Sequence, residues 1–248
     1  MYLTRFRFNT NRPGSRRLLS SPQATHAAVL GGFPDLLPGD PGNQGEAGAP
    51  RVLWRVDRNA RAEVLLYVVS PTAPDLTHLV EQAGWPAAEA PGWQSHDYGA
   101  FLEKLEAGQT WAFRLTANPV HSIRRKDGEP TKVTAHLTPR HQAGWLLQRQ
   151  EACGIEIVRK PVEQQLLPGE DEHELVVHGR DASGFDKPDP RTGRGKGNGR
   201  MRVPLVTATF DGRLTVTDPD ALRRVLCAGL GRAKAYGCGL MTLAPVGR

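Results

Sequence analysis

The residues best suited to chemistry lie near the end of the sequence, in a glycine-rich segment that contains two cations. The segment reads Gly229-Leu-Gly-Arg-Ala-Lys234 and continues as Gly237-Cys-Gly-Leu240. Glycine has no Cβ, so its backbone can approach a bulky partner closely and present N–H groups to an anion. Arg232 and Lys234 add positive charge. We therefore expect this loop to bind a phosphate-rich chain; a flexible turn before a terminal strand is the alternative interpretation.

The order of elements around this loop excludes a nucleotide-cofactor motif. A helix is expected over residues 218–227, and an apolar strand follows the loop. P-loops and dinucleotide-binding fingerprints instead lie between a strand and the helix that follows it. We therefore expect no cofactor.

The composition describes a globular protein with a basic surface. The 248 residues are 39% hydrophobic, which is enough apolar material for a core, and the formal net charge is +6. This length allows one large domain or two domains of about 100–150 residues. Most of the 32 basic residues are arginines, whose planar guanidinium groups bind phosphates with two hydrogen bonds. The charge balance fits nucleic acid or another anionic surface.

Cysteine and acidic residues give no sign of a disulfide framework or a metal site. Cys153, Cys227 and Cys238 are widely spaced and contain no C-x-x-C pair. The Asp and Glu residues show no paired spacing of the kind that a metal nuclease uses. No apolar run approaches the roughly 18 residues that span a membrane, and the charged, alternating start is unlike a signal peptide. We expect a cytoplasmic protein with free thiols, no metal and no membrane partner.

The first half of the chain contains patterns that predict four strands and two helices. Residues 2–8 alternate large apolar and polar side chains, as a half-buried strand does. Ser20-Ser-Pro22 predicts the start of a helix over 22–30, which ends at Gly31. Residues 12–17 are expected to form a basic connection. The other predicted elements are a hairpin of strands 51–56 and 63–70, a helix over 74–82 and a strand within 93–101.

The sequence predicts the same order of elements in the second half. Asp211-Gly212 predicts the turn of a hairpin between strands 203–210 and 213–217. The remaining predicted elements are strands 110–117, 155–159 and 174–177, a helix from 139 to about 152, the helix 218–227 and a last strand. The repeated β-α-β-β-α-β order predicts an α+β fold of two tandem ferredoxin-like domains, residues 1–104 and 105–248. A single larger α+β domain is the alternative.

Basic residues gather in three further segments. Residues 186–202 are rich in proline and glycine, a composition typical of a disordered surface loop. Basic segments of this kind often become ordered when they bind RNA. In residues 118–126, His121 lies close in sequence to three cations. These cations could equally belong to a solvated surface loop. His136 and His141 flank a predicted helix start, where a structural role is expected. The cations of the three segments are Arg191, Arg194, Lys196, Arg200 and Arg202; Arg124, Arg125 and Lys126; and Arg16 and Arg17.

Four segments in matching order resemble the CasE family, the CRISPR repeat endoribonucleases of the type I-E (Cascade) system. The resemblance covers nearly the full length of the chain, including the Met-Tyr-Leu start. The segments are Thr116-Ala-Asn-Pro119, Gly144-Trp-Leu146, Phe210-Asp-Gly-Arg-Leu214 with Asp218-Pro219, and the glycine-rich loop.

This resemblance implies two ferredoxin-like domains and a metal-independent enzyme that cuts CRISPR precursor RNA at the base of each repeat hairpin. The product stays bound, and the enzyme becomes a subunit of Cascade. The catalytic histidine of the family lies in the first helix within a Tyr-x-x-His pattern. The corresponding residues here are Gln23-Ala-Thr-His26, so the histidine is present and the tyrosine is replaced by Gln23.

Metal-free RNA cleavage uses the ribose 2′-hydroxyl as the nucleophile, and it needs a base, an acid and cations that hold the charge of the phosphorane. Histidine, with an unperturbed pKa near 6.5, can serve in either proton-transfer role. We expect His26 to transfer the proton and Gln23 to position the scissile phosphate, although histidines in helices are often structural. The RNA-binding residues expected with them are Arg16, Arg17, Arg124, Arg125, Lys126, Arg191, Arg194, Lys196, Arg200, Arg232 and Lys234.

Two other functions remain open at the level of the sequence. One is a guide-RNA-binding subunit with little or no catalysis, which the absence of the tyrosine favours. The other is an unrelated basic ferredoxin-like RNA-binding module. The sequence has no clear aromatic strand of the type with which RNA-recognition modules stack bases, which argues against the second.

Overall fold

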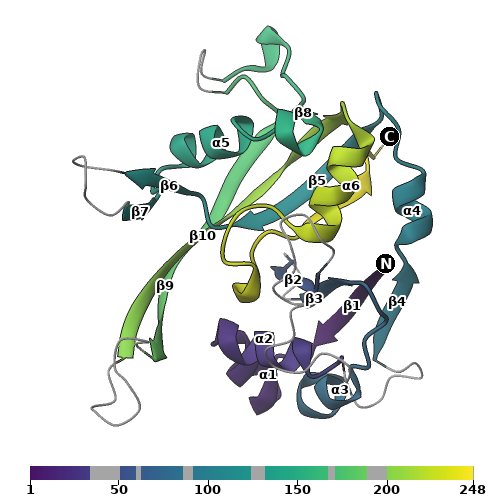
Figure 1. Ribbon diagram of the computed structural model, residues 1–248, viewed down its shortest axis with the longest axis vertical. Helices are drawn as coiled ribbons and strands as arrows, with labels where there is room; N and C mark the ends of the chain where they lie inside the picture. The colour runs from purple at the N-terminus through teal and green to yellow at the C-terminus, as the bar shows by residue number, and fades with distance from the viewer. Residues whose placement is uncertain are drawn as a thin grey trace.

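The computed structural model describes residues 1–33, 51–59, 63–85, 92–123, 132–166, 171–188 and 200–247. It confirms the mixed α+β class. One antiparallel sheet has the order β2-β3-β1-β4, and a second has the order β11-β5-β10-β8, with β9 also paired to β10. Figure 1 shows the first sheet and its helices below the second. None of the helices in the described parts of the chain combines the length and apolar character needed to cross a membrane.

In the first half, helices cover one face of the sheet. Strand β1 alternates because successive side chains point to opposite faces, and it buries Phe6 and Phe8 in a cluster with Leu18, Val29 and Leu79 from three helices. The elements are β1 (Tyr2–Phe8), α1 (Pro13–Leu19), α2 (Pro22–Leu30), β2 (Leu53–Arg58), β3 (Val64–Ser70), α3 (Thr77–Ala83), β4 (Trp93–Asp97) and α4 (Gly99–Glu103).

Helix α2 begins and ends where the sequence predicts. The Ser21 side chain accepts a hydrogen bond from the backbone N–H of Ala24 at 3.2 Å, and Pro22 occupies the first turn. The preceding segment was expected to be a connection, and that prediction is wrong, because residues 13–19 form α1. Ser15 and Leu18, one turn apart, are buried, and the Ser15 hydroxyl donates to the Ala83 carbonyl at 2.9 Å. Tertiary contacts therefore stabilise this short helix.

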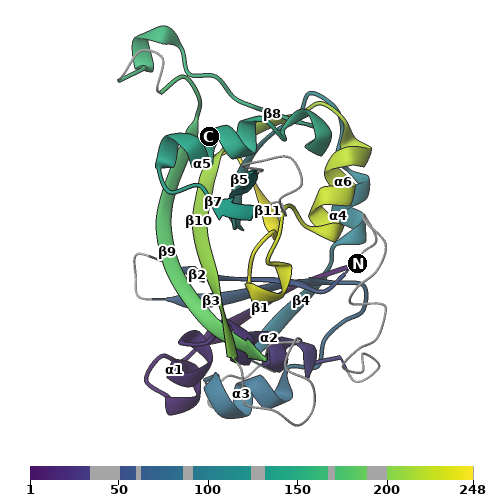
Figure 2. The ribbon, with the colours of Figure 1, turned by 60° about the vertical axis from the view of Figure 1, so that its left-hand side comes forward.

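In the second half, a long β9–β10 ribbon extends from the sheet toward the N-terminal helices (Figure 2). The predicted hairpin at Asp211-Gly212 is wrong, because β10 runs straight through both residues. Asp211 pairs with Arg114 on one side and Val176 on the other. The elements are β5 (Thr110–Ala117), β6 (Val120–Ile123), β7 (Lys132–Ala135), α5 (Pro139–Leu147), β8 (Ile155–Ile157), β9 (Leu175–Pro188), β10 (Arg200–Val216), α6 (Pro219–Ala228) and β11 (Met241–Pro245).

Gly212 serves close packing rather than a turn. A Cβ at this position would lie 2.2 Å from the carbonyl oxygen of Glu174, so the backbone of the neighbouring segment can approach only a glycine. Helix α5 is also shorter than predicted. It ends at Leu147, and a separate 3₁₀ turn, Glu151–Cys153, leads to Gly154, whose φ of 69° ends the segment as expected.

The two sheets have the same strand order when each half is counted separately. The first sheet has the order β2-β3-β1-β4, so its strands lie second, third, first and fourth in chain order. If β5, β8, β10 and β11 are counted as the first to fourth strands of the second half, its order β8-β10-β5-β11 is the same. The β6–β7 hairpin and β9 are additions to this pattern. One buried cluster lies wholly within the first half, whereas the other joins Leu53, Val69 and Tyr98 to the core of the second half. The halves therefore share part of their core.

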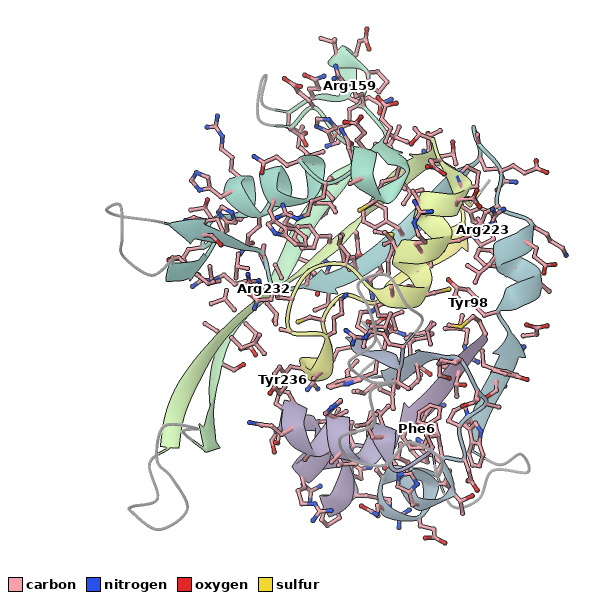
Figure 3. The ribbon with its side chains drawn as sticks, viewed as in Figure 1. Phe6, Tyr98, Arg159, Arg223, Arg232 and Tyr236 are labelled. Carbon is pink, nitrogen blue, oxygen red and sulfur yellow. The ribbon has the colours of Figure 1, made fainter. Side chains whose placement is uncertain are left out.

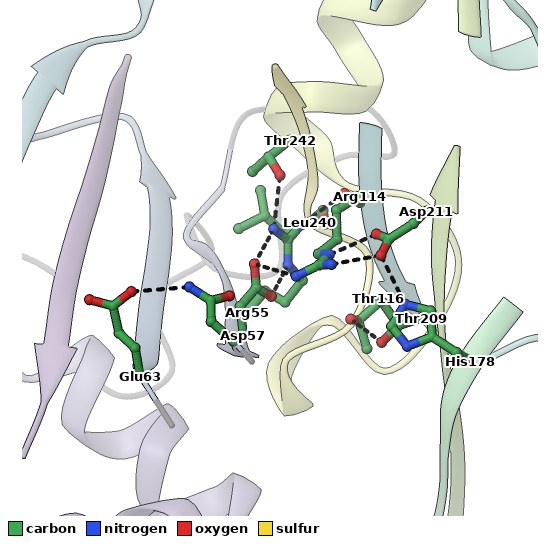
Figure 4. Close-up of polar contacts among 11 residues, drawn as sticks. Arg55, Asp57, Glu63, Arg114, Thr116, His178, Thr209, Asp211, Leu240 and Thr242 are labelled. Atoms are coloured by element: carbon green, nitrogen blue, oxygen red, sulfur yellow. Dashed lines mark hydrogen bonds and ion pairs between the residues drawn. The ribbon is translucent and has the colours of Figure 1, made fainter. Parts of the chain in front are cut away.

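A buried arginine joins the two sheets (Figure 4). The Arg55 side chain is 2% exposed, and its Nε and Nη2 donate to the two Asp57 carboxylate oxygens at 2.6 and 2.8 Å. Its Nη1 donates to the carbonyl oxygens of Arg114 and Leu240 at 2.8 and 2.9 Å, and Nη2 also donates to the Thr242 hydroxyl at 2.8 Å. One side chain of β2 thus hydrogen-bonds to β5, to the glycine-rich loop and to β11.

The polar chain continues outward along the second sheet. Arg114 Nη1 lies 3.8 Å from Asp57, and its Nε and Nη2 donate to Asp211 at 2.7 and 2.6 Å. His178 Nε2 lies 2.9 Å from the same carboxylate. Burial alone would raise the pKa of Asp211, but the hydrogen bonds from Arg114 and His178 hold it below its usual value. Charges of alternating sign therefore extend from the buried Arg55 through Asp57 and Arg114 to Asp211, which also contacts the half-exposed His178.

We expect the Arg55→Met substitution to lower the free energy of unfolding by about 3–5 kcal/mol, because it leaves the buried Asp57 carboxylate without its main partner. Chemical denaturation at equilibrium measures the loss. The control is Arg213→Met, which breaks a more exposed ion pair with Glu174 at 3.2 Å and is expected to cost less than about 1 kcal/mol. Equal small losses in both variants would contradict the role given to Arg55.

Candidate active site

The candidate active site is a pocket of about 490 Å³ between α2 and the glycine-rich loop. It is lined by His26 from α2, by Arg51 and Val52 just before β2, and by residues 231–235 of the loop. The short 3₁₀ helix η4 (Lys234–Tyr236) closes the loop beside α2. Figure 3 labels Arg232 and Tyr236 on this loop, with Tyr236 close to α2. The fold therefore brings together His26 and the loop cations, which are far apart in the sequence.

Close packing fixes the path of the loop. A Cβ at Gly231 would lie 3.1 Å from the Trp145 ring, and one at Gly237 would lie 2.8 Å from the Trp54 ring. Both glycines also have positive φ, as does Ala233 at 62°. A non-glycine residue in the left-handed region costs roughly 1–2 kcal/mol. Because the strained residue lines the pocket, the surrounding contacts must hold this backbone in place.

Backbone hydrogen bonds attach the loop to the second sheet. The N–H of Gly239 donates to the Thr116 carbonyl of β5 at 2.7 Å, and the N–H of Leu230 donates to the Gly239 carbonyl at 2.9 Å. Arg232 forms an isolated antiparallel bridge with Asn118, just beyond β5. The loop is thus held at both ends, so the cations at positions 232 and 234 extend from a fixed backbone.

His26 is half-buried and has one ring nitrogen without a partner. Its Nδ1 is enclosed and makes no hydrogen bond to the described residues. Burial lowers the pKa of the His26 imidazole below its ordinary value. Burial therefore favours the neutral imidazole near pH 7, and a neutral imidazole can accept a proton.

The pocket collects three cations around this neutral histidine. Burial, and then the nearby charge of Arg51, lower the pKa of Lys234. Arg232 remains exposed at the rim. Sequence reasoning missed Arg51, whose neighbours in the sequence show no motif; its backbone N–H donates to the Cys227 carbonyl at 3.3 Å and so places it next to the loop. The arrangement favours an anion and offers it a proton acceptor.

Gln23 lies on the same helix but does not line this pocket. Its Oε1 accepts a hydrogen bond from the Ser21 hydroxyl at 3.2 Å, within the cap of α2. His26 follows three positions later, and residues with this spacing are neighbours on a helix surface.

The remaining predicted RNA-binding residues fall into two groups. Arg16 and Arg17 are exposed on α1, which packs against α2. The Arg16 guanidinium donates to the Asn11 carbonyl at 2.7 Å, and that of Arg17 to Gln82 Oε1 at 3.3 Å. Neither of them lines the His26 pocket. Arg200 begins β10, but its side chain is outside the described residues, as are Arg124, Arg125, Lys126, Arg191, Arg194 and Lys196.

Three other histidines gather beside the β6–β7 hairpin. The ring centroids of His121 and His136 are 4.4 Å apart, and those of His136 and His141 are 6.0 Å apart. Burial lowers the pKa of His136, and the positive charge of the neighbouring groups lowers it further. Within the described ranges, no group of three or more His, Cys, Asp or Glu side chains is placed to hold a metal ion.

The chain matches a known family over nearly its whole length. A family model described as "CRISPR associated protein" matches residues 1–245. The CRISPR-associated endoribonuclease Cse3 of Thermus thermophilus is 29% identical over 250 residues, covering 99% of this chain and 100% of that protein. The CRISPR system Cascade subunit CasE of Escherichia coli K12 is 27% identical over 205 residues, covering 78% and 89%.

Solved structures show the same fold. Thermus thermophilus Cse3 bound to an RNA that represents a pre-cleavage complex has a TM-score of 0.65 and 25% identity, with 98% of each chain covered. Cse3 bound to a 19-nucleotide RNA also has a TM-score of 0.65, at 24% identity, covering 99% of this chain and 100% of that one. Cas6e of Escherichia coli K-12 has a TM-score of 0.55 and 22% identity, with 99% and 100% covered.

The neutral state of His26 gives a prediction for the free protein. We expect the pKa of His26 to lie below the 6.5 typical of histidine, because burial disfavours the imidazolium. A proton–nitrogen NMR titration of the imidazole signals measures it, and His26→Asn assigns the signal by its disappearance. A pKa above 6.5 in the free protein would mean that the pocket stabilises the cation, contrary to the burial argument.

Proposed function

Because the chain belongs to the CasE family of CRISPR-associated proteins, we propose that it is an endoribonuclease that cuts CRISPR precursor RNA at the base of the repeat hairpin without a metal ion. The observation that carries this proposal is the half-buried imidazole of His26 in the lining of a pocket that Arg51, Arg232 and Lys234 also line. A proton acceptor beside three cations suits the transfer of a phosphodiester.

The reaction begins with the 2′-hydroxyl of the nucleotide before the cut. Its oxygen forms a bond to the adjacent phosphorus while His26 accepts the proton. The bond from phosphorus to the 5′ oxygen of the next nucleotide then breaks. That oxygen takes up a proton from water, and His26 returns the proton that it accepted to the solvent. The products are a 2′,3′-cyclic phosphate and a 5′-hydroxyl end. Arg232 and Lys234 offset the additional negative charge of the phosphorane in the transition state.

Gln23 enters the proposal as a positioning residue. Its Oε1 already accepts a hydrogen bond from Ser21, and an amide nitrogen donates hydrogen bonds to phosphate oxygens. In this role, Gln23 orients the scissile phosphate but does not exchange a proton. Its position on the helix surface beside His26 supports this assignment.

We assign residues 1–104 and 105–248 to two ferredoxin-like domains. The shared strand order of the two sheets supports the assignment. In this arrangement, Arg16 and Arg17 on α1 contact the RNA near the cut. Arg124, Arg125 and Lys126, together with Arg191, Arg194, Lys196 and Arg200, contact the backbone of the stem, because A-form RNA hides its base edges in a deep groove and leaves phosphates accessible.

We further propose that the product hairpin stays bound and that the complex joins other Cascade subunits. The name of the Escherichia coli relative, a Cascade subunit, supports this. A second candidate function is a guide-RNA hairpin-binding subunit with weak or no catalysis. Gln23 favours it, because the resemblance implies a tyrosine at this position. Both functions predict tight binding of the hairpin, so only turnover separates them.

We expect His26→Ala to slow cleavage of the cognate repeat RNA by about 10²–10⁴-fold, the usual contribution of one positioned acid or base. Single-turnover cleavage in EDTA measures the rate, and a binding assay tests whether affinity is kept. A substrate with a single 2′-deoxy nucleotide at the cut is expected to bind and remain intact. If the wild-type protein binds tightly and never cuts, the binding-subunit function replaces the enzymatic one.

The loop cations give a separate prediction for affinity. We expect Arg232→Ala together with Lys234→Ala to weaken hairpin binding and to reduce the slope of log affinity against log salt by about 1 for each charge that contacts a phosphate. The matched control is Arg224→Ala on α6, an exposed arginine that does not line the His26 pocket. An equal change in slope per charge removed would assign the effect to net charge rather than to the loop.

A further inference from the structure

A second groove lies beside the His26 pocket, where the two halves of the chain meet. It has a volume of about 160 Å³. The first half contributes side chains from α1, α2 and β2, and the second contributes side chains from β5, β9, β10 and η4. The residues used in the following argument are Thr25, Trp54, Arg58, Asp181, Ser183 and Tyr236.

The groove and the pocket share two elements. Thr25 lines the groove and His26 lines the pocket; likewise Ala235 lines the pocket and Tyr236 the groove. Helix α2 and η4 therefore form the wall between the two spaces. An RNA strand that places a phosphate at His26 has its neighbouring nucleotide next to this wall, because a phosphate and the adjoining base belong to the same short unit.

Trp54 lines the groove, and the N–H of its buried indole has no acceptor among the described residues. The residue is 4% exposed. The backbone of Gly237 covers part of the ring, since a Cβ there would lie 2.8 Å from it. Buried tryptophan N–H groups normally find an acceptor. The acceptor for this one is therefore expected from a bound molecule.

The size and rim of the groove fit one aromatic ring system. A cavity of about 150 Å³ holds a benzene molecule, whereas pockets for drug-sized ligands measure about 300–1,000 Å³. Around the opening, Asp181 supplies hydrogen-bond acceptors, Arg58 supplies donors, and Ser183 supplies a hydroxyl that can do either. Unpaired bases of RNA are recognised by such a combination of an aromatic surface and polar groups at the base edge.

We propose that this groove binds one unpaired nucleobase of the RNA, next to the scissile phosphate, and so selects the nucleotide at the cut. This inference rests on the proposed function, because it needs an RNA phosphate at His26. The base contacts Tyr236 and accepts a hydrogen bond from Trp54 Nε1. Asp181 and Ser183 then bind its polar edge. Both halves of the chain line the groove, so the base contacts them together.

The test combines abasic RNA with a change at Trp54. In uncleavable repeat RNA carrying 2′-deoxy at the cut, each unpaired nucleotide near the cut is replaced in turn by an abasic one. We expect one position to weaken binding to the wild-type protein by about 10-fold, the loss typical of a base stacked on an aromatic side chain. In Trp54→Phe, which keeps a ring and removes the N–H, the same abasic change is expected to cost clearly less.

Two controls separate the groove from other causes. Trp111 on β5 lies outside the groove, and its indole N–H donates to Gln109 Oε1 at 3.2 Å. Trp111→Phe removes this N–H and is expected to leave the abasic penalty unchanged. Asp181→Asn changes an exposed residue of the groove. It keeps the proposal testable if Trp54→Phe fails to fold, which thermal unfolding would reveal, because it too should reduce the penalty.

The outcomes distinguish this proposal from the one on which it rests. If the wild type cuts unmodified RNA and each abasic penalty is the same in the wild type, Trp54→Phe and Asp181→Asn, the groove binds no base, while the endoribonuclease function stands. If the wild type binds the RNA without cutting it, an abasic penalty that is smaller in Trp54→Phe than in the wild type still supports base binding in the groove. Failure to bind the repeat RNA at all would overturn both.

Discussion

The buried Arg55 is the constraint on which the rest of the structure depends. A guanidinium that is removed from water must have its charge and all its N–H groups satisfied, and Arg55 obtains this from both halves of the chain. Its partners include the Asp57 carboxylate and the carbonyl of Leu240, at the end of the glycine-rich loop. Any shift of one sheet against the other would break several of these bonds together. These hydrogen bonds therefore fix the relative position of the two halves next to the glycine-rich loop.

The position of the candidate site follows from that constraint. Neither half alone encloses His26: α2 supplies the imidazole, and the loop attached to the second sheet supplies Arg232 and Lys234. The loop reaches α2 because its backbone accepts unfavourable conformations, including a left-handed Ala233. Such strain persists only where the surrounding structure determines the path of the chain. The polar chain from Arg55 to Asp211 connects β2 to the sheet to which the loop is attached.

The sequence predicted those features whose causes are local. Helix α2 follows from a serine cap and a proline in its first turn, and the α+β class from the periodicity of the strands. The errors arose where distant residues decide. Asp211-Gly212 has the composition of a turn, but the Asp211 carboxylate is held by Arg114 and His178, and Gly212 makes room for the carbonyl of Glu174. Helix α1 depends on contacts with α3, and Arg51 reaches the pocket only through the tertiary fold.

The two sides of the His26 pocket come from segments near opposite ends of the sequence, with consequences for the order in which the pocket forms. At the usual rate of synthesis of about 5–20 residues per second, the loop leaves the ribosome on the order of ten seconds or more after α2. During that interval α2 can fold with the first sheet, but the cations that complete the pocket do not yet exist. An unfinished or truncated chain therefore presents His26 without its anion-binding partner. The pocket proposed to bind the phosphodiester is therefore complete only when the last strand has docked.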